Sequence, residues 1–213
     1  ATTLEYLIGI DENGKEAADK FMKNFRVKRW INDASTEQDQ PVITMSSQLS
    51  GAGYGNNAYV KSALSYLALK DYLGDDLFKK ALHHYMDNWN GKHPIPWDYF
   101  NSMNAGSGKN LNWFFNNWFY TNNYIDLKIS SVIEQDKQLV VTVENVGGFA
   151  VPFDAVVTYD DNSMEKVHFT PSVWEKNQKQ TNLNFAVKKK VKSVNLDGGI
   201  FMDYTVGDNW KSF

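Results

Sequence analysis

The spacing of apolar residues changes near residue 126, and this change constrains the fold more than any other feature of the sequence. Before residue 126, apolar side chains recur every three or four positions, as Ala18, Phe21, Met22 and Phe25 do. Such a period is typical of helices that bury one face. The helices that it predicts cover about 15–30, 58–73 and 110–120, with a further helix that begins after Gly74.

After residue 126 the apolar period becomes two, as in Leu139, Val141 and Val143. Turn-forming Gly and Asp clusters separate the alternating runs, and six or seven short strands fit within roughly 85 residues. This pattern predicts an antiparallel β-sandwich of immunoglobulin-like type. We therefore predict an α+β chain with two domains, a helical one over 1–126 and a β-sandwich over 127–213.

Composition excludes several functions. The 213 residues include no cysteine, which rules out disulfides, thiolate metal sites and a cysteine nucleophile but leaves the cellular compartment open. The net charge is −3 and a single short basic run lies at 188–192, so we expect no nucleic acid partner. No stretch approaches the ~20 apolar residues of a membrane span. The four histidines, from which any imidazole metal site would be built, are His83, His84, His93 and His168.

Three motifs are more specific than helix formation requires. They are Tyr59-Val60-Lys61-Ser62, the segment Lys-His-Pro-Ile-Pro-Trp-Asp-Tyr-Phe at 92–100, and the segment Ser-Gly-Lys-Asn-Leu-Asn-Trp-Phe-Phe-Asn-Asn-Trp-Phe at 107–119. Their order and spacing resemble the gluzincin aminopeptidases, the zinc peptidases of the aminopeptidase N and leukotriene hydrolase type. Ser62 stands where the family has Gly, and Asn110 stands where it has Asp, which caps a helix equally well.

The resemblance implies the helical half of a thermolysin-like catalytic domain, followed by the family's sandwich domain. It also implies a parent enzyme that uses zinc to remove N-terminal residues from peptide substrates. Residues 1–6 resemble the continuation of the segment that carries the family's third zinc ligand. We therefore expect the zinc-binding His-Glu-x-x-His to precede Ala1, no metal ligand and no zinc in this chain alone, and an exposed apolar face through which it self-associates.

The resemblance assigns the catalytic role to Tyr59. Peptide hydrolysis passes through a tetrahedral intermediate whose oxygen becomes negative, and a second donor opposite the metal stabilises that charge. A tyrosine hydroxyl has a pKa of about 10, so at neutral pH it donates a hydrogen bond without adding charge. The resemblance also places Tyr54, in the glycine-rich loop expected at 51–56, at the substrate pocket.

The remaining candidates have weaker support. His83 and His84 are adjacent, so on a helix they point about 100° apart and do not share a metal. We expect His168 to face solvent from a strand, and we find no partner for Glu5 as a base. The alternative function is a non-catalytic binding or scaffolding module for protein or glycan, with the aromatic cluster at 113–118 as a stacking platform rather than core.

Overall fold

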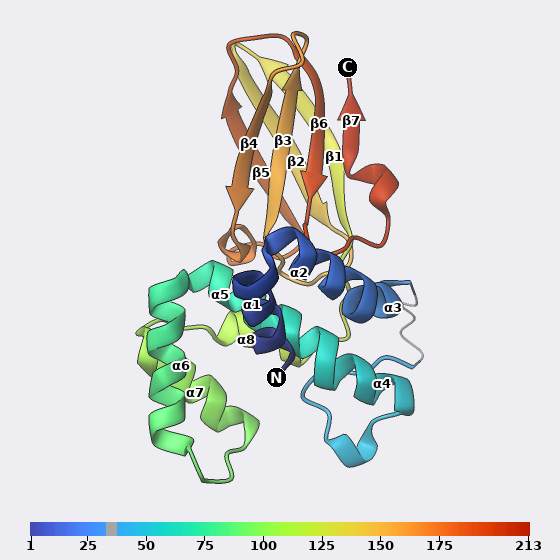
Figure 1. Cartoon of the computed structure of the whole chain (residues 1–213). Coiled ribbons are helices and arrows are strands. Elements are labelled where there is room, and N and C mark those ends of the chain that lie inside the picture. The colour runs from blue at the N-terminus through green and yellow to red at the C-terminus, as the bar shows by residue number, and fades with distance from the viewer. Residues whose placement is uncertain (33–37) are drawn as a thin grey trace.

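The structure is a computed structural model that describes residues 1–32 and 38–213. Helices form the N-terminal part, and the strands form a sandwich whose end packs against this helical layer (Figure 1). The α-helices are α1 (Thr2–Asn13), α2 (Lys15–Phe21), α3 (Lys28–Ile31), α4 (Gly51–Gly55), α5 (Ser62–Leu73), α6 (Asp75–Trp89), α7 (Pro96–Ser107) and α8 (Asn112–Phe119). Two π-helical segments, η1 (Met22–Val27) and η3 (Asn56–Lys61), continue α2 and α4.

Glycines set the helix junctions. Gly14 ends α1 and Gly74 ends α5, with φ of 81° and 76°, a left-handed conformation that favours glycine. The predicted stop at Gly74 is therefore confirmed. Gly106 in α7 has a different role, because a Cβ there would lie 2.7 Å from the Cα of Ala81 in α6. Its missing side chain lets the two helices pack closely. Of the helices that the structure describes, none is both long and apolar enough to cross a bilayer.

The helix predicted over 15–30 forms, but its buried face differs from the prediction. Ala18, Met22 and Val27 are buried, whereas Phe21 and Phe25 are exposed and stack on each other with ring centroids 5.0 Å apart. Phe21 at the end of α2 and Phe25 in η1 do share one face, as the spacing predicts, but that face is exposed. A π-helix bonds each N–H five residues back and holds more residues per turn, which fits the burial of both Met22 and Val27, five positions apart.

The second part is an antiparallel sandwich of two sheets, in the orders β1-β2-β5 and β4-β3-β6-β7. Leu139 pairs with Phe185 and Val141 with Leu183, and all four side chains are buried between the sheets. The predicted alternation and the predicted sandwich are therefore confirmed. The strands are β1 (Leu127–Gln135), β2 (Gln138–Asn145), β3 (Phe153–Tyr159), β4 (Met164–Phe169), β5 (Gln180–Ala186), β6 (Val191–Asp197) and β7 (Trp210–Ser212).

Helix α8 joins the helical layer to the sandwich. The indole of Trp118 stacks on Phe149 at 4.2 Å, and its Nε1 donates a hydrogen bond to the carbonyl of Ala150 at 3.0 Å. The Asn117 side chain accepts from the amide of Ala150 and donates to the carbonyl of Gly148. The aromatic cluster at 113–118 therefore belongs mainly to the core, since Phe114, Phe115 and Trp118 are all buried. The domain boundary at residue 126 stays a prediction.

Candidate functional site

The segment that carries Tyr54 and Tyr59 is helical, so the expected glycine-rich loop at 51–56 is wrong. Residues 51–55 form α4, and η3 continues it to Lys61. The hydroxyl of Ser50 accepts a hydrogen bond from the amide of Gly53 and so caps the first turn, which offsets the poor helix propensity of glycine. Gly53 also leaves room for the side chain of Gln40, because a Cβ at position 53 would lie only 2.6 Å from Gln40 Oε1.

Tyr59 lies on the π-helical segment η3 with 46% of its surface exposed. It lines an open hollow of 640 Å³ between η1 and the segment 51–60. The guanidinium of Arg26 lies 5.6 Å from the centre of its ring, within the range of a cation–π contact. The other described residues that line this hollow are Phe25, Arg29, Gln38, Gly51, Ala52, Gly55, Asn56 and Val60.

Arg26 is a neighbour of Tyr59 that the sequence analysis missed. Its Nη2 donates to both carboxylate oxygens of Glu5, at 2.9 and 3.0 Å, so Glu5 does have a partner and that expectation is wrong. The pair connects η1 to α1 and fixes the guanidinium over the phenol ring. Because 21 residues separate Glu5 from Arg26, no local pattern in the sequence indicates the contact.

Lys61, two residues after Tyr59, is fully buried. Its Nζ donates to both carboxylate oxygens of Asp39 at 3.2 Å and to the carbonyl of Gln40 at 2.6 Å. Asp39 also accepts from the indole of Trp30 at 3.2 Å and from the side chain of Asn56 at 3.3 Å. Burial lowers the pKa of Lys61, while the charge of Asp39 opposes that shift. The Lys61–Asp39 pair therefore anchors the helical turn that presents Tyr59.

Tyr54 lies on α4 with half of its surface exposed. It is not among the described residues that line the hollow at Tyr59. The structure thus brings Tyr59 and Arg26 together and leaves Tyr54 on a neighbouring part of the surface. Its assignment to a substrate pocket stays a prediction.

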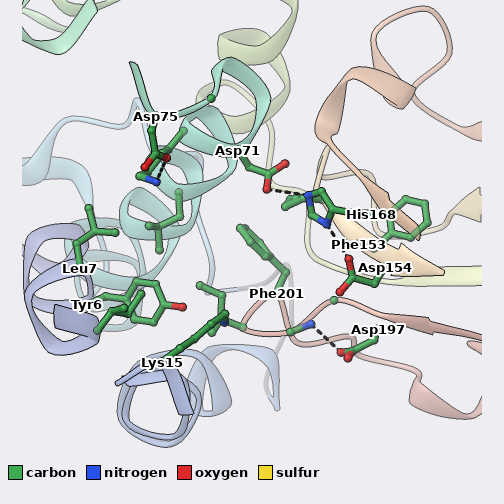
Figure 2. A pocket seen from close by; sticks show the side chains of 18 residues that line it. Tyr6, Leu7, Lys15, Asp71, Asp75, Phe153, Asp154, His168, Asp197 and Phe201 are labelled. Carbon is green, nitrogen blue, oxygen red and sulfur yellow. Dashed lines mark hydrogen bonds and ion pairs between the residues drawn. The ribbon is translucent and has the colours of Figure 1, made fainter. Parts of the chain in front are cut away.

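A second hollow, of 470 Å³, lies between the helical layer and the sandwich (Figure 2). His168 on β4 bridges the two parts: its Nδ1 lies 2.7 Å from Asp154 on β3, and its Nε2 lies 2.9 Å from Asp71 on α5. The expectation that His168 faces solvent is confirmed, since half of its side-chain surface is exposed, but the sequence did not indicate the bridge. Burial alone would lower its pKa, but the hydrogen bond to Asp154 and the charge of Asp71 outweigh this and raise the pKa.

The site thus consists of an exposed tyrosine two residues before a buried lysine, on a helical layer that packs against a sandwich. The sequence profile of the peptidase family M1 domain matches residues 1–118, and the chain belongs to this family. The predicted resemblance is thereby confirmed. A search of curated protein sequences finds no match.

Solved structures bear out the fold. Among 62 matching chains is the crystal structure of Legionella pneumophila aminopeptidase A in complex with aspartic acid. It matches with a TM-score of 0.64 over 92% of this chain at 16% sequence identity. The match confirms the predicted fold class, the helical part of a peptidase domain followed by a sandwich. This chain spans 22% of the length of that protein.

Members of this family typically depend on zinc, but the residues at the hollow do not fit a zinc ion. None of the described residues that line it is a histidine, cysteine, aspartate or glutamate, the side chains that bind zinc in proteins. Within residues 1–32 and 38–213, a single group of three such side chains lies close enough to share an ion, and it consists of Asp126, Asp203 and Asp208. The described residues at this hollow therefore do not supply a zinc site.

Proposed function

We propose that this chain is the C-terminal part of a zinc aminopeptidase and contributes Tyr59 as the hydrogen-bond donor to the oxyanion. The peptidase origin rests on the family match over 1–118. The observation that carries the role of Tyr59 is its position. Tyr59 is the first residue of the motif that resembles the family's, and its side chain is half exposed in an open hollow. A tyrosine sealed in the core would not reach a substrate.

The surroundings of Tyr59 suit a donor. The phenol is uncharged at neutral pH, so it donates to a developing oxyanion without a change of its own charge. The Arg26 guanidinium over the ring adds positive charge on the same side. Helical residues on both sides and the buried Lys61 hold the tyrosine backbone in place before substrate binds, which reduces the reorganisation needed in the transition state.

If the full-length protein binds zinc, the ion would supply Lewis-acid chemistry to the substrate carbonyl and the attacking water. We propose that its ligands, the His-Glu-x-x-His pair and a following glutamate, lie in residues that precede Ala1. The first test is therefore the gene sequence immediately upstream. If that segment lacks His-Glu-x-x-His, the enzyme assignment fails and the scaffolding alternative replaces it.

The second test measures turnover in the full-length protein with an aminoacyl 4-nitroanilide. Tyr59→Phe should lower kcat by about 10²–10³, the cost of one lost oxyanion donor. The matched control is Tyr120→Phe, because Tyr120 is also partly exposed, at 41%, but does not line the hollow. Equal kcat values for the Tyr59→Phe and wild-type proteins would exclude the catalytic role.

Tyr54 is proposed to contact the peptide substrate rather than the reacting atoms. If so, Tyr54→Ala raises KM and leaves kcat near the wild-type value, the signature of lost ground-state binding. A fall in kcat at constant KM would contradict this assignment.

Exposed apolar side chains on the first helices support a further part of the proposal. Leu4, Ile8, Phe21 and Phe25 are between 38% and 71% exposed. We propose that this surface packs against the preceding part of the catalytic domain, and that the 213-residue chain alone self-associates through it. Size-exclusion chromatography of the chain and of Phe25→Ser should show a concentration-dependent dimer for the first only, and a monomeric wild-type chain would refute it.

A further inference from the structure

Three carboxylates meet where the chain enters the sandwich. Asp126 directly precedes β1, Asp203 follows β6, and Asp208 ends the short 3₁₀-helix η5 (Val206–Asp208) that precedes β7. One oxygen of each lies within 4.8 Å of one oxygen of the others. Segments far apart in the sequence thus bring three negative charges to one place.

The three carboxylates have no ion-pair partner among the residues that the structure describes. Within the described part of the chain, no lysine, arginine or histidine forms an ion pair with any of the three. The Asp203 oxygens accept from the amides of Leu127 at 2.7 Å and Thr205 at 2.8 Å, and the Thr205 hydroxyl lies 3.4 Å from Asp126 Oδ2. Uncompensated like charges this close repel each other strongly where water is excluded.

An amide side chain beside the carboxylates provides a second, independent observation. Asn209 directly follows Asp208 in the chain and is only 4% exposed. Its Oδ1 is buried without a hydrogen-bond partner, and so are Asp126 Oδ1 and Asp208 Oδ1. These are three of the seven such side-chain atoms in the described residues. A single shared proton supplies one donor and cannot satisfy three oxygens, whereas one cation can.

We propose that Asp126, Asp203, Asp208 and Asn209 form a site for a hard divalent cation, with Ca²⁺ as the ion. All the donor atoms are carboxylate or amide oxygens, which are the ligands of Ca²⁺. The three carboxylate oxygens lie within 4.8 Å of one another, which is close enough for them to share one ion at Ca–O distances of about 2.4 Å. The ion ties the start of β1 to the segment that leads into β7 and is separate from the catalytic zinc proposed above.

The test uses the 213-residue chain, freed of metals with EDTA and then dialysed. Thermal unfolding is followed in CaCl₂, in MgCl₂ and in NaCl at equal ionic strength. Ca²⁺ at about 100 times its dissociation constant should raise Tm by about 5–10 °C, and NaCl should not. Asp208→Asn should abolish the shift, while Asp87→Asn, which removes an exposed carboxylate on α6, should preserve it.

Terbium luminescence tests occupancy without reference to stability. Tyr124 lies two residues before Asp126 in the chain, and its ring packs edge-on against Tyr204 with centroids 5.7 Å apart. Tb³⁺ in the Ca²⁺ site should therefore emit when tyrosine is excited, and Ca²⁺ should displace it. A Tm shift with Mg²⁺ alone would overturn the choice of Ca²⁺. The absence of both a Tm shift and Tb³⁺ emission in the wild-type chain would overturn the site.

Discussion

Replacing Lys61 with methionine should destabilise the fold strongly, because it removes the cation that compensates Asp39. Both side chains are buried, with 0% and 6% of their surfaces exposed. Methionine has a similar length, so the loss of packing is small and the unpaired carboxylate dominates. Removing one partner of a buried ion pair typically costs about 3–5 kcal/mol. The remaining donors to Asp39, from Trp30 and Asn56, place Lys61→Met at the lower end of that range.

The free energy of unfolding is measured with urea and circular dichroism. The matched control is Lys70→Met, since Lys70 pairs with Asp75, whose side chain is 63% exposed. That substitution should cost at most about 1 kcal/mol. The double variant Asp39→Asn, Lys61→Met should be more stable than the sum of the two single losses predicts, because neither charge is then left alone. A loss for Lys61→Met no larger than for Lys70→Met would refute the anchoring role.

Two further predictions concern the interface and the helical packing. The pKa of His168 in the folded state lies above its unfolded value of about 6.5, so its bridge to Asp71 and Asp154 contributes fully below about pH 6.5 and is lost as pH rises through the folded pKa. The Tm advantage of the wild type over His168→Gln should therefore shrink from about pH 6 to about pH 9, and parallel profiles would contradict this. Gly106→Val should cost about 1–3 kcal/mol in urea unfolding through overpacking of α6 against α7, whereas Gly207→Ala, which meets no atom within 4 Å, should be neutral.

The elements with strong periodicity could be predicted from the sequence. The alternation at Leu139, Val141 and Val143 reports directly which face of β2 is buried, because side chains on a strand point to opposite sides in turn. Gly74 ends a helix because its φ is unfavourable for other residues. These signals are local, so they do not depend on what packs against the element.

The π-helical segments could not be predicted. A shift from i→i+4 to i→i+5 bonding changes which residues share a face but leaves the composition unchanged. In η1 both Met22 and Val27, five positions apart, are buried, whereas the apolar spacing groups Met22 with the exposed Phe25. The stretch 51–55 is helical in spite of its glycines because Ser50 caps it and Gln40 packs against it.

Contacts between distant segments were also beyond the sequence. His168 looks like an ordinary strand residue, and only the docking of the sandwich on α5 brings Asp71 to it, 97 residues earlier in the chain. Asp126 and Asp208 of the acidic cluster are likewise far apart in the sequence, and the path of the chain after β6 brings them together. Such sites depend on how the two parts pack, which apolar periodicity does not describe.

The spacing within the Tyr59-Val60-Lys61 motif connects the anchor to the proposed chemistry. Residues two positions apart on a helix lie on nearly opposite faces. Here Tyr59 is 46% exposed and Lys61 is fully buried, so one turn presents a phenol to the hollow and inserts an ammonium into the core. Burying the Lys61 ammonium is unfavourable unless it pairs with Asp39. The helical turn therefore keeps the one position that allows this ion pair. A hydrogen-bond donor to an oxyanion is most effective when its position is fixed before the reaction. In the proposed site, Lys61 provides this fixed position for Tyr59.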